Sequence, residues 1–254
     1  MTELLLDTFA KNGLLTSFAA VGATMYISYV ISSRLTKGRI HGSAIAILLG
    51  LVLAYIGGVS TGGQKGLADL QLFSGIGLMG GAMLRDFAIV STAFGASFEE
   101  VKKAGASGIL SLFLGIVTAY AVGLVIAWSF GYTDAVSLAT IGAGAVTYIV
   151  GPVTGAALGA SSEVIALSIA AGLVKSVLVM IGTPFAAKYI GLNNPRTALI
   201  FGGMLGTTSG VTGGLAATDP RLVPYGAVTS TFYTGLGCLL CPSVLFLITK
   251  SLFG

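Results

Sequence analysis

Two runs rich in glycine, threonine and serine carry the groups best suited to bind a ligand. One covers residues 142–155 and includes Pro152, and the other covers residues 206–214. Their hydroxyl groups can donate hydrogen bonds to a carboxylate. A helix that breaks at such a run also exposes free backbone N–H groups at its positively polarised end, and its freed carbonyl groups suit a hard cation such as Na⁺. The two runs therefore predict a site for a small polar anion, a small cation, or both.

The candidate substrate-binding residues are hydroxyl side chains of these runs and two cations inside apolar segments. They are Thr147, Thr154, Thr207, Thr208, Ser209, Thr212, Lys175 and Arg85. An ionisable side chain at mid-bilayer costs roughly 2.5–3.5 kcal/mol, so each of the two cations needs a function or a partner. For Lys175 the alternative is that its stem carries the ammonium to the membrane surface. For Arg85 the alternative is a structural ion pair.

Candidate Na⁺ ligands are Gly151, Gly206 and Asp86. No other ion or cofactor is expected. The two cysteines, Cys238 and Cys241, lie in one apolar segment without the further ligands that a metal site needs, and we interpret them as small packing residues.

The composition identifies the elements that must position these residues. The chain is 55% hydrophobic and 9% charged, with a mean hydropathy of +0.96, whereas a soluble domain has roughly 25% charged residues. A membrane-spanning helix needs about 20 apolar residues. By this measure we predict an all-α integral membrane protein in which residues 1–254 form one transmembrane transporter domain. About eight hydrophobic segments are expected, near residues 13–33, 42–58, 69–92, 105–130, 135–160, 162–187, 197–218 and 224–249.

The glycine-rich runs lie inside two of these segments. A helix in lipid must satisfy its backbone polar groups internally, so glycine and proline clusters at mid-depth indicate a protein-lined cavity. Close packing of helices through small residues is the alternative, but packing does not require hydroxyl groups. We therefore predict two or more discontinuous helices whose broken ends meet near mid-membrane, as in the binding sites of secondary transporters.

The Lys and Arg residues are concentrated in two loops, at residues 34–41 and 98–104. Because cytoplasmic loops carry an excess of Lys and Arg, both loops are predicted to face the cytoplasm and the N-terminus to face outside. Two topologies stay open beyond residue 134. Lys188 and Arg196 face outside if residues 135–160 cross the membrane, and inside if this segment dips in and returns.

Several charged residues have local explanations. Asp134 and Ser161-Ser162-Glu163 precede apolar segments, where they are predicted to cap helix N-termini. Asp219-Pro220-Arg221 predicts a turn. The net charge of +4 does not indicate a nucleic-acid partner. The acidic first residues do not form a cleaved signal peptide.

Two other functional classes fit the chain less well. A channel would favour rings of like charge or a repeated selectivity filter. This chain instead has only two such runs, and their sequences differ. An intramembrane enzyme needs a compact group of catalytic side chains, and the single His and the scattered acids do not supply one. The residues alone thus indicate a secondary transporter of a small organic anion.

Three motifs add a resemblance to a known family. They are the runs at residues 37–47 (KGRIHGSAIAI), 206–220 (GTTSGVTGGLAATDP) and 233–242 (YTGLGCLLCP). The chain resembles, over essentially its whole length, the large (M) subunit of the bacterial malonate:sodium symporter. The resemblance implies multi-pass insertion in the bacterial inner membrane and uptake of the dicarboxylate malonate together with Na⁺. It also implies a separate small membrane subunit, the L component. Another small mono- or dicarboxylate, an accessory membrane subunit and a higher homo-oligomer stay open as alternatives.

Overall fold

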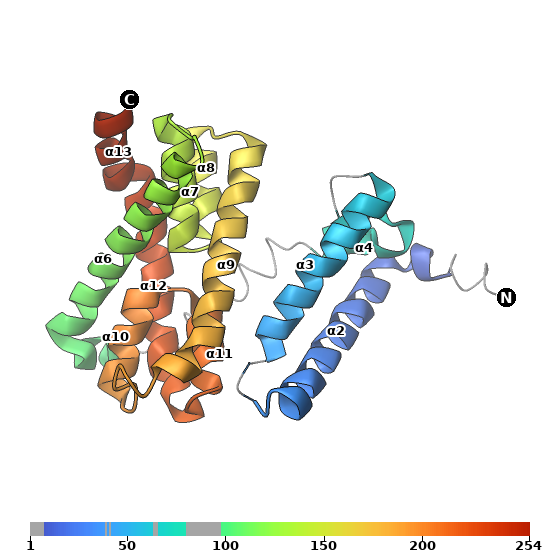
Figure 1. The fold of residues 1–254 in the computed structure, drawn as a ribbon, viewed down its shortest axis with the longest axis horizontal. Coiled ribbons are helices and arrows are strands. Elements are labelled where there is room, and N and C mark those ends of the chain that lie inside the picture. The colour runs from blue at the N-terminus through green and yellow to red at the C-terminus, as the bar shows by residue number, and fades with distance from the viewer. Residues whose placement is uncertain (1–7, 39, 41, 63–65, 80–97) are drawn as a thin grey trace. The chain divides into compact units, whose positions relative to one another are not determined.

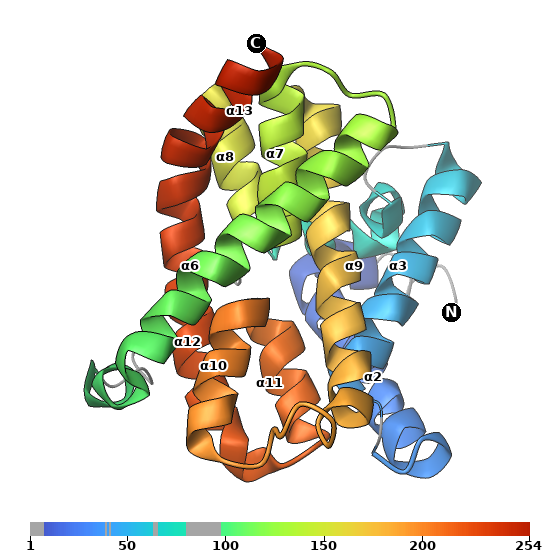
Figure 2. The same ribbon diagram turned by 60° about the vertical axis from the view of Figure 1, so that its left-hand side comes forward.

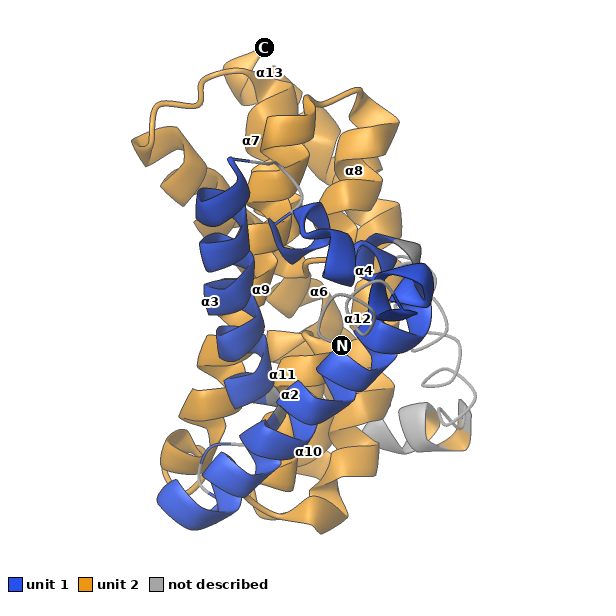
Figure 3. Cartoon of the chain, turned by 90° about the vertical axis from the view of Figure 1, so that its right-hand side faces the viewer, with its two compact units in different colours: residues 1–91 blue, residues 92–254 orange. Residues whose placement is uncertain are grey.

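The structure is a computed structural model that describes residues 8–38, 40, 42–62, 66–79 and 98–254. It is 84% helical, and the residues within these ranges form no strand. The prediction of an all-α protein is therefore confirmed. The chain divides into two compact units, Met1–Ser91 and Thr92–Gly254 (Figure 3). The prediction that the whole chain is one transmembrane domain stays a prediction.

The first unit is built on two antiparallel helices, α2 (Gly13–Leu35) and α3 (Gly42–Thr61). The backbone turns between them at Lys37 and Gly38, which both have positive φ angles. Small residues bring the two helices together, since a side chain at Gly42 would collide with the ring of Tyr29. Three short elements follow: η1 (Gly66–Asp69), η2 (Gln71–Phe73) and α4 (Gly75–Leu78).

The second unit contains the two glycine-rich runs. Its elements in chain order are α6 (Phe98–Ser129), α7 (Ala135–Val146), α8 (Val150–Leu158), α9 (Ser162–Ala186), α10 (Pro195–Leu205), α11 (Thr208–Ala216), η3 (Pro220–Leu222), α12 (Val223–Leu240), a π-helical turn (Cys241–Leu245) and α13 (Phe246–Phe253). Gly105, with φ of 63°, separates the charged first turns of α6 from its apolar part. Pro242 lies in the π-helical turn and cannot donate a backbone hydrogen bond there.

The long helices of this unit cross it from end to end, whereas the short ones form two hairpins. In Figures 1 and 2, α7 and α8 lie at the end that carries the C-terminus, and α10 and α11 lie at the opposite end. At 1.5 Å per residue, α7 and α8 are about 18 and 14 Å long, too short for a hydrocarbon core of about 30 Å. Each pair therefore begins and finishes at the same end of the unit. This geometry favours the topology in which the segment 135–160 dips in and returns, and its orientation in a membrane stays a prediction.

Among the residues that the structure describes, five helical segments are long and apolar enough to cross a membrane. They lie within Gly13–Leu35, Ala44–Phe73, Gly105–Ser129, Ser162–Ala186 and Pro220–Phe253. The count of eight predicted segments is not confirmed, because two of those segments are hairpins of short helices and much of the segment at residues 69–92 lies outside the described residues. The prediction of at least two discontinuous helices agrees with the two hairpins.

Candidate functional site

The first helix break lies at Thr147, between α7 and α8. Thr147 has an extended backbone (φ −154°, ψ 155°) and is only 2% exposed. Its Oγ1 accepts hydrogen bonds from the N–H groups of Ile149 (3.2 Å) and Val150 (3.1 Å). The first N–H groups of a helix have no partner within that helix, so this hydroxyl starts α8. Because the Thr147 oxygen already accepts these two bonds, its O–H donor is the group that a ligand could use.

The second break lies at Gly206 and Thr207, between α10 and α11. Gly206 has φ of 64°, which favours glycine. The Tyr233 ring also occupies the space that a side chain at Gly206 would need. Thr207 is fully buried, and its hydroxyl is hydrogen-bonded to that of Ser176 on α9. The Tyr233 ring thus packs against the second break, and the Ser176–Thr207 hydrogen bond attaches this break to α9.

One turn of α9 contacts both breaks. The Lys175 ammonium donates hydrogen bonds to the Val146 carbonyl (2.9 Å) and to the Tyr233 hydroxyl (3.2 Å). The next residue, Ser176, is the partner of Thr207. The alternative that Lys175 carries its charge to the membrane surface is wrong, because the ammonium is directed at the first break.

The position of this charge has an electrostatic reason. Val146 is the last residue of α7, and the carbonyl groups at the end of a helix lack partners and carry partial negative charge. A positive ammonium next to them is therefore stabilised. An ammonium has three N–H donors, and the described residues accept two of them. Among the described residues, the third donor has no acceptor.

Tyr233 completes this arrangement, and the sequence interpretation missed it. It is fully buried, and its hydroxyl donates to the Gly115 carbonyl of α6 (3.0 Å). The Lys175 ammonium lies 5.1 Å from its ring centroid, within the range of a cation–π interaction. A tyrosine in the middle of an apolar segment is a usable signal, since its hydroxyl must find a partner. The sequence does not say which partner.

Two predicted residues each have a buried hydroxyl oxygen without a partner. Thr154 on α8 is fully buried, and neither its Oγ1 nor the buried Oγ of Ser209 on α11 has a hydrogen-bond partner among the described residues. Buried hydroxyl groups are normally paired, and an unpaired one requires an explanation. Binding of a substrate or ion is one such explanation.

Thr212 and Gly151 have structural contacts. Thr212 donates to the Thr208 carbonyl in its own helix (2.7 Å). A side chain at Gly151 would meet the Ser168 hydroxyl at 2.5 Å, so glycine there allows α8 to pack on α9. None of Thr154, Thr208, Ser209 and Thr212 is hydrogen-bonded to Lys175 in the described part of the chain.

Arg85 and Asp86, the remaining candidates for substrate and Na⁺, lie outside the described residues. Their roles stay predictions.

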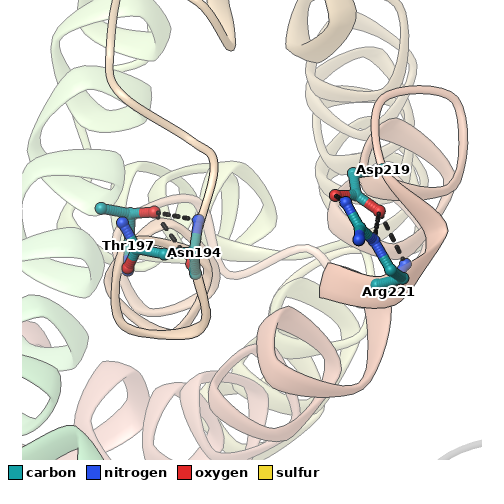
Figure 4. Close-up of polar contacts among 4 residues, drawn as sticks. All are labelled: Asn194, Thr197, Asp219 and Arg221. Atoms are coloured by element: carbon teal, nitrogen blue, oxygen red, sulfur yellow. Dashed lines mark hydrogen bonds and ion pairs between the residues drawn. The ribbon is translucent and has the colours of Figure 1, made fainter.

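The loops at the end of the unit that carries the second hairpin are fixed by polar side chains (Figure 4). The Asn194 side chain accepts from the Thr197 N–H (3.1 Å) and caps α10. Asp219 accepts from the Arg221 guanidinium (2.9 Å) and from its backbone N–H (3.1 Å), which confirms the predicted turn. The Arg221 guanidinium, together with that N–H, holds the pKa of Asp219 below its usual range.

The opposite end of the unit has the two predicted helix caps. The Asp134 carboxylate accepts from the Ser137 N–H (2.8 Å) at the start of α7. The Ser161 hydroxyl accepts from the Val164 N–H (3.3 Å) at the start of α9, with Glu163 in the first turn. Both predictions of local capping are confirmed.

Comparison with known proteins identifies a family. The family model described as the malonate/sodium symporter MadM subunit matches residues 5–253, nearly the whole chain. No curated protein and no solved structure matches this chain.

Proposed function

The chain belongs to the malonate/sodium symporter MadM subunit family, and we propose that it transports malonate with Na⁺ by alternating access around its two helix breaks. It is a multi-pass membrane transport subunit and not an enzyme. The observation that carries the proposal is the position of Lys175. Its ammonium lies at the first break and retains a donor for an anion, while the next residue of α9 binds the second break.

The charge of the substrate supports cation coupling. Malonate is largely a dianion near neutral pH. Moving two negative charges into an inside-negative cell costs about 4.6 kcal/mol per 100 mV, from about 2.3 per charge. Two co-transported Na⁺ ions remove this electrical cost, and a third makes uptake electrogenic. Lys175 and the broken helix ends then stabilise the charge that Na⁺ does not neutralise within the site.

We assign the substrate to Lys175 together with the hydroxyl groups at the breaks. The unpaired hydroxyls of Thr154 and Ser209 are the strongest of these candidates, because burial without a partner is costly. The remaining proposed substrate ligands are Thr147, Thr207, Thr208, Thr212 and Arg85. The proposed Na⁺ ligands are Gly151, Gly206 and Asp86.

The charges at the two ends of the second unit support an orientation. Four cations lie near one end of the unit, where the start of α6, the end of α9, the start of α10 and η3 meet (Figure 1). They are Lys102 in α6, Lys188 just after α9, Arg196 in α10 and Arg221 in η3. At the other end, Lys250 is the one cation among the described residues. Because basic loops stay in the cytoplasm, we place the first end there, in the bacterial inner membrane.

A reconstitution experiment tests the proposed function. The chain is placed in proteoliposomes with and without the small L component, and uptake of radiolabelled malonate is followed with and without an inward Na⁺ gradient. We expect saturable accumulation that requires Na⁺ and the small subunit. Unlabelled acetate and succinate, as competitors, distinguish malonate from other carboxylates. Uptake by both subunits that does not respond to Na⁺, or that never saturates, would overturn the proposal.

A further inference from the structure

The two helix breaks occupy corresponding places in the second unit. A long helix, α6, precedes the hairpin α7–α8, and a second long helix, α9, precedes the hairpin α10–α11. Figures 1 and 2 show that α6 and α9 run in opposite directions and that the hairpins lie at opposite ends. In each hairpin the break separates the end of one short helix from the start of the next. The two helix starts differ in how their backbone N–H groups are satisfied.

The first break satisfies its own helix start. The N–H groups of Ile149 and Val150 donate to the Thr147 hydroxyl oxygen. The N–H of Gly151 donates to the Thr147 carbonyl (3.2 Å), and the next residue, Pro152, has no N–H. The start of α8 therefore has none of these backbone donors left for an anion.

The second break has no such cap. Thr207 occupies the N-cap position of α11, but its side chain accepts no hydrogen bond from the helix. The Val211 N–H donates to the Thr207 carbonyl (2.8 Å). The N–H groups of Thr208, Ser209 and Gly210 have no acceptor within the described part of the chain. Unpaired N–H groups at the positive end of a helix dipole suit a carboxylate or a phosphate group.

Two fully buried hydroxyl groups add a donor at the same place. Ser176 on α9 and Thr207 are hydrogen-bonded to each other and to no other group that the structure describes. Two hydroxyl groups carry two hydrogens, and the bond between them uses one. The second hydrogen therefore has no acceptor there, although buried polar groups are normally paired. A ligand oxygen beside this pair would accept it.

The hydroxyl pair lies against the first turn of α11. A side chain at Gly210 would meet the Thr207 methyl carbon at 2.7 Å and the Ser176 carbonyl oxygen at 2.8 Å, so both residues contact this turn. The Ser209 oxygen in the same turn is buried and has no partner within the described residues. The start of α11 thus combines three kinds of unpaired donor: backbone N–H groups, the hydroxyl pair and the Ser209 hydroxyl.

The chemistry of these groups favours an anion over Na⁺. An N–H group can only donate, and the positive end of a helix dipole disfavours a cation. The Lys175 ammonium belongs to the residue before Ser176, and it contacts Tyr233, whose ring packs on Gly206. Positive charge and unpaired donors are therefore both found at the second break.

We infer that the start of α11, completed by the Ser176–Thr207 pair, binds a carboxylate group of the transported anion, and that its backbone donors come from the second break rather than from the first. The inference rests on the proposed function, to which it adds the N–H groups of Thr208, Ser209 and Gly210 and the Ser176 hydroxyl. Because these ligands belong to both α9 and α11, the site is complete only while the second hairpin packs on α9.

Ser209→Asp tests the sign of the charge that the site accepts. An acidic residue in the first turn of a helix is favourable, so the variant is expected to fold. In proteoliposomes that contain both subunits it should lose malonate uptake, because its own carboxylate takes the donors and repels the substrate. Ser209→Asn, with the same shape and no charge, is the matched control and should retain saturable uptake.

Ser176→Ala tests the hydroxyl pair. It should raise the malonate concentration for half-maximal uptake by roughly 2- to 10-fold, from the net value of a hydrogen bond, with little change in the maximal rate. Ser168→Ala is its matched control. Ser168 is also fully buried on α9, but its hydroxyl donates to the Ile165 carbonyl of its own helix (2.6 Å). This variant should retain the malonate dependence of the unmodified protein.

Uptake by the unmodified protein separates failure of the inference from failure of the proposed function. Where the unmodified protein shows Na⁺-coupled uptake, normal malonate dependence of Ser209→Asp or of Ser176→Ala would overturn the inference. Equal effects of Ser176→Ala and Ser168→Ala would do the same. A lower Na⁺ concentration for half-maximal uptake in Ser209→Asp would show that a cation binds there instead. Absence of malonate uptake by the unmodified protein would contradict the proposed function itself.

Discussion

The Lys175 ammonium donates a 2.9 Å hydrogen bond to the carbonyl of Val146, the residue at which α7 ends. A charge carried by α9 thus stabilises the end of a helix that belongs to a different part of the chain. Because this ammonium also contacts Tyr233 of α12, an anion that binds Lys175 acts on three elements at once. A ligand shifts an equilibrium between two conformations only by its different affinity for each of them, and a ligand on Lys175 can sense the positions of all three elements.

Lys175→Gln is predicted to abolish or greatly weaken malonate uptake. Glutamine retains N–H donors but loses the charge, and the loss of charge-assisted hydrogen bonds corresponds to roughly 10- to 150-fold in affinity. The measurement is the initial rate of uptake against malonate concentration, normalised to the inserted protein. Lys188→Gln, at an exposed position just after α9, is the control and should transport normally. Near-normal kinetics of Lys175→Gln would remove Lys175 from the substrate site.

Thr154→Val distinguishes a ligand-binding hydroxyl from a packing residue. Valine has nearly the same volume, and removal of a fully buried hydroxyl that lacks a partner should leave the thermal stability of the ligand-free protein unchanged or raise it. If Thr154 binds malonate or Na⁺, the half-saturation concentration of that ligand rises by roughly 5- to 150-fold, from 1–3 kcal/mol. Thr183→Val is the matched control, since the Thr183 hydroxyl is satisfied by the Val179 carbonyl (2.5 Å). If uptake by Thr154→Val depends on malonate and Na⁺ as in the unmodified protein, Thr154 is a packing residue and binds neither ligand.

The locations of the helices and their caps were predictable because local sequence determines them. The predicted segments 13–33 and 162–187 correspond to α2 (Gly13–Leu35) and α9 (Ser162–Ala186), since long apolar stretches define a membrane helix by themselves. The breaks were predictable for the same reason, because Gly206 requires a backbone conformation that other residues avoid.

The contacts that make the site were not predictable from local sequence. The hydrogen bonds of Lys175 to Val146 and Tyr233, and of Ser176 to Thr207, join residues far apart in the chain. Whether the segment 135–160 crosses or returns was also undetermined, because its total length suits a full crossing. Its break at Thr147 leaves two helices that are each too short to span the membrane.

Gly206→Ala is predicted to destabilise the protein by more than roughly 1 kcal/mol and to abolish uptake, because the φ of 64° disfavours a side chain and the Tyr233 ring leaves no room for a methyl group. Thermal unfolding in detergent measures the first effect. Gly235→Ala on α12 is the control, since nothing lies within 4 Å of a side chain added there. Alanine in that helix should be favourable by roughly 0.5–1 kcal/mol. Equal unfolding temperatures for both variants would contradict the structure at the second break.

The Asp134 cap is expected to make the stability of the folded protein depend on pH. Partial burial raises the pKa of Asp134, but hydrogen bonds from the Ser137 backbone and side chain, together with those from the Asp134 and Val136 backbone, outweigh it and leave the pKa below its usual value. A depressed pKa in the folded state means that the stabilisation is complete above the unfolded value of about 3.9 and is lost as the pH falls through the folded value.

Asp134→Ala should therefore lower stability at neutral pH by about 1 kcal/mol, the usual value of an N-cap. This difference from the unmodified protein should disappear in acid. Asp134→Asn keeps a capping oxygen without the titration, so its stability should change less between neutral and acidic pH. Thermal unfolding of the three proteins at several pH values checks this, and a constant difference for Asp134→Ala at all pH values would contradict it.

Tyr233→Phe separates the two functions that this residue combines. The ring is kept, so the packing against Gly206 is retained, whereas the Gly115 carbonyl loses its donor and Lys175 loses an acceptor. The loss of one net hydrogen bond should lower stability by roughly 0.5–1.5 kcal/mol, a change that a folded membrane protein tolerates. Malonate uptake should weaken more than this stability loss explains, because the ammonium is then held only by Val146.

Combination with Lys175→Gln provides the decisive comparison. If the hydroxyl acts through Lys175, the double variant is no more impaired in malonate uptake than Lys175→Gln alone, since contacting residues are non-additive. Additive losses would mean that the Tyr233 hydroxyl serves the fold independently of the ammonium.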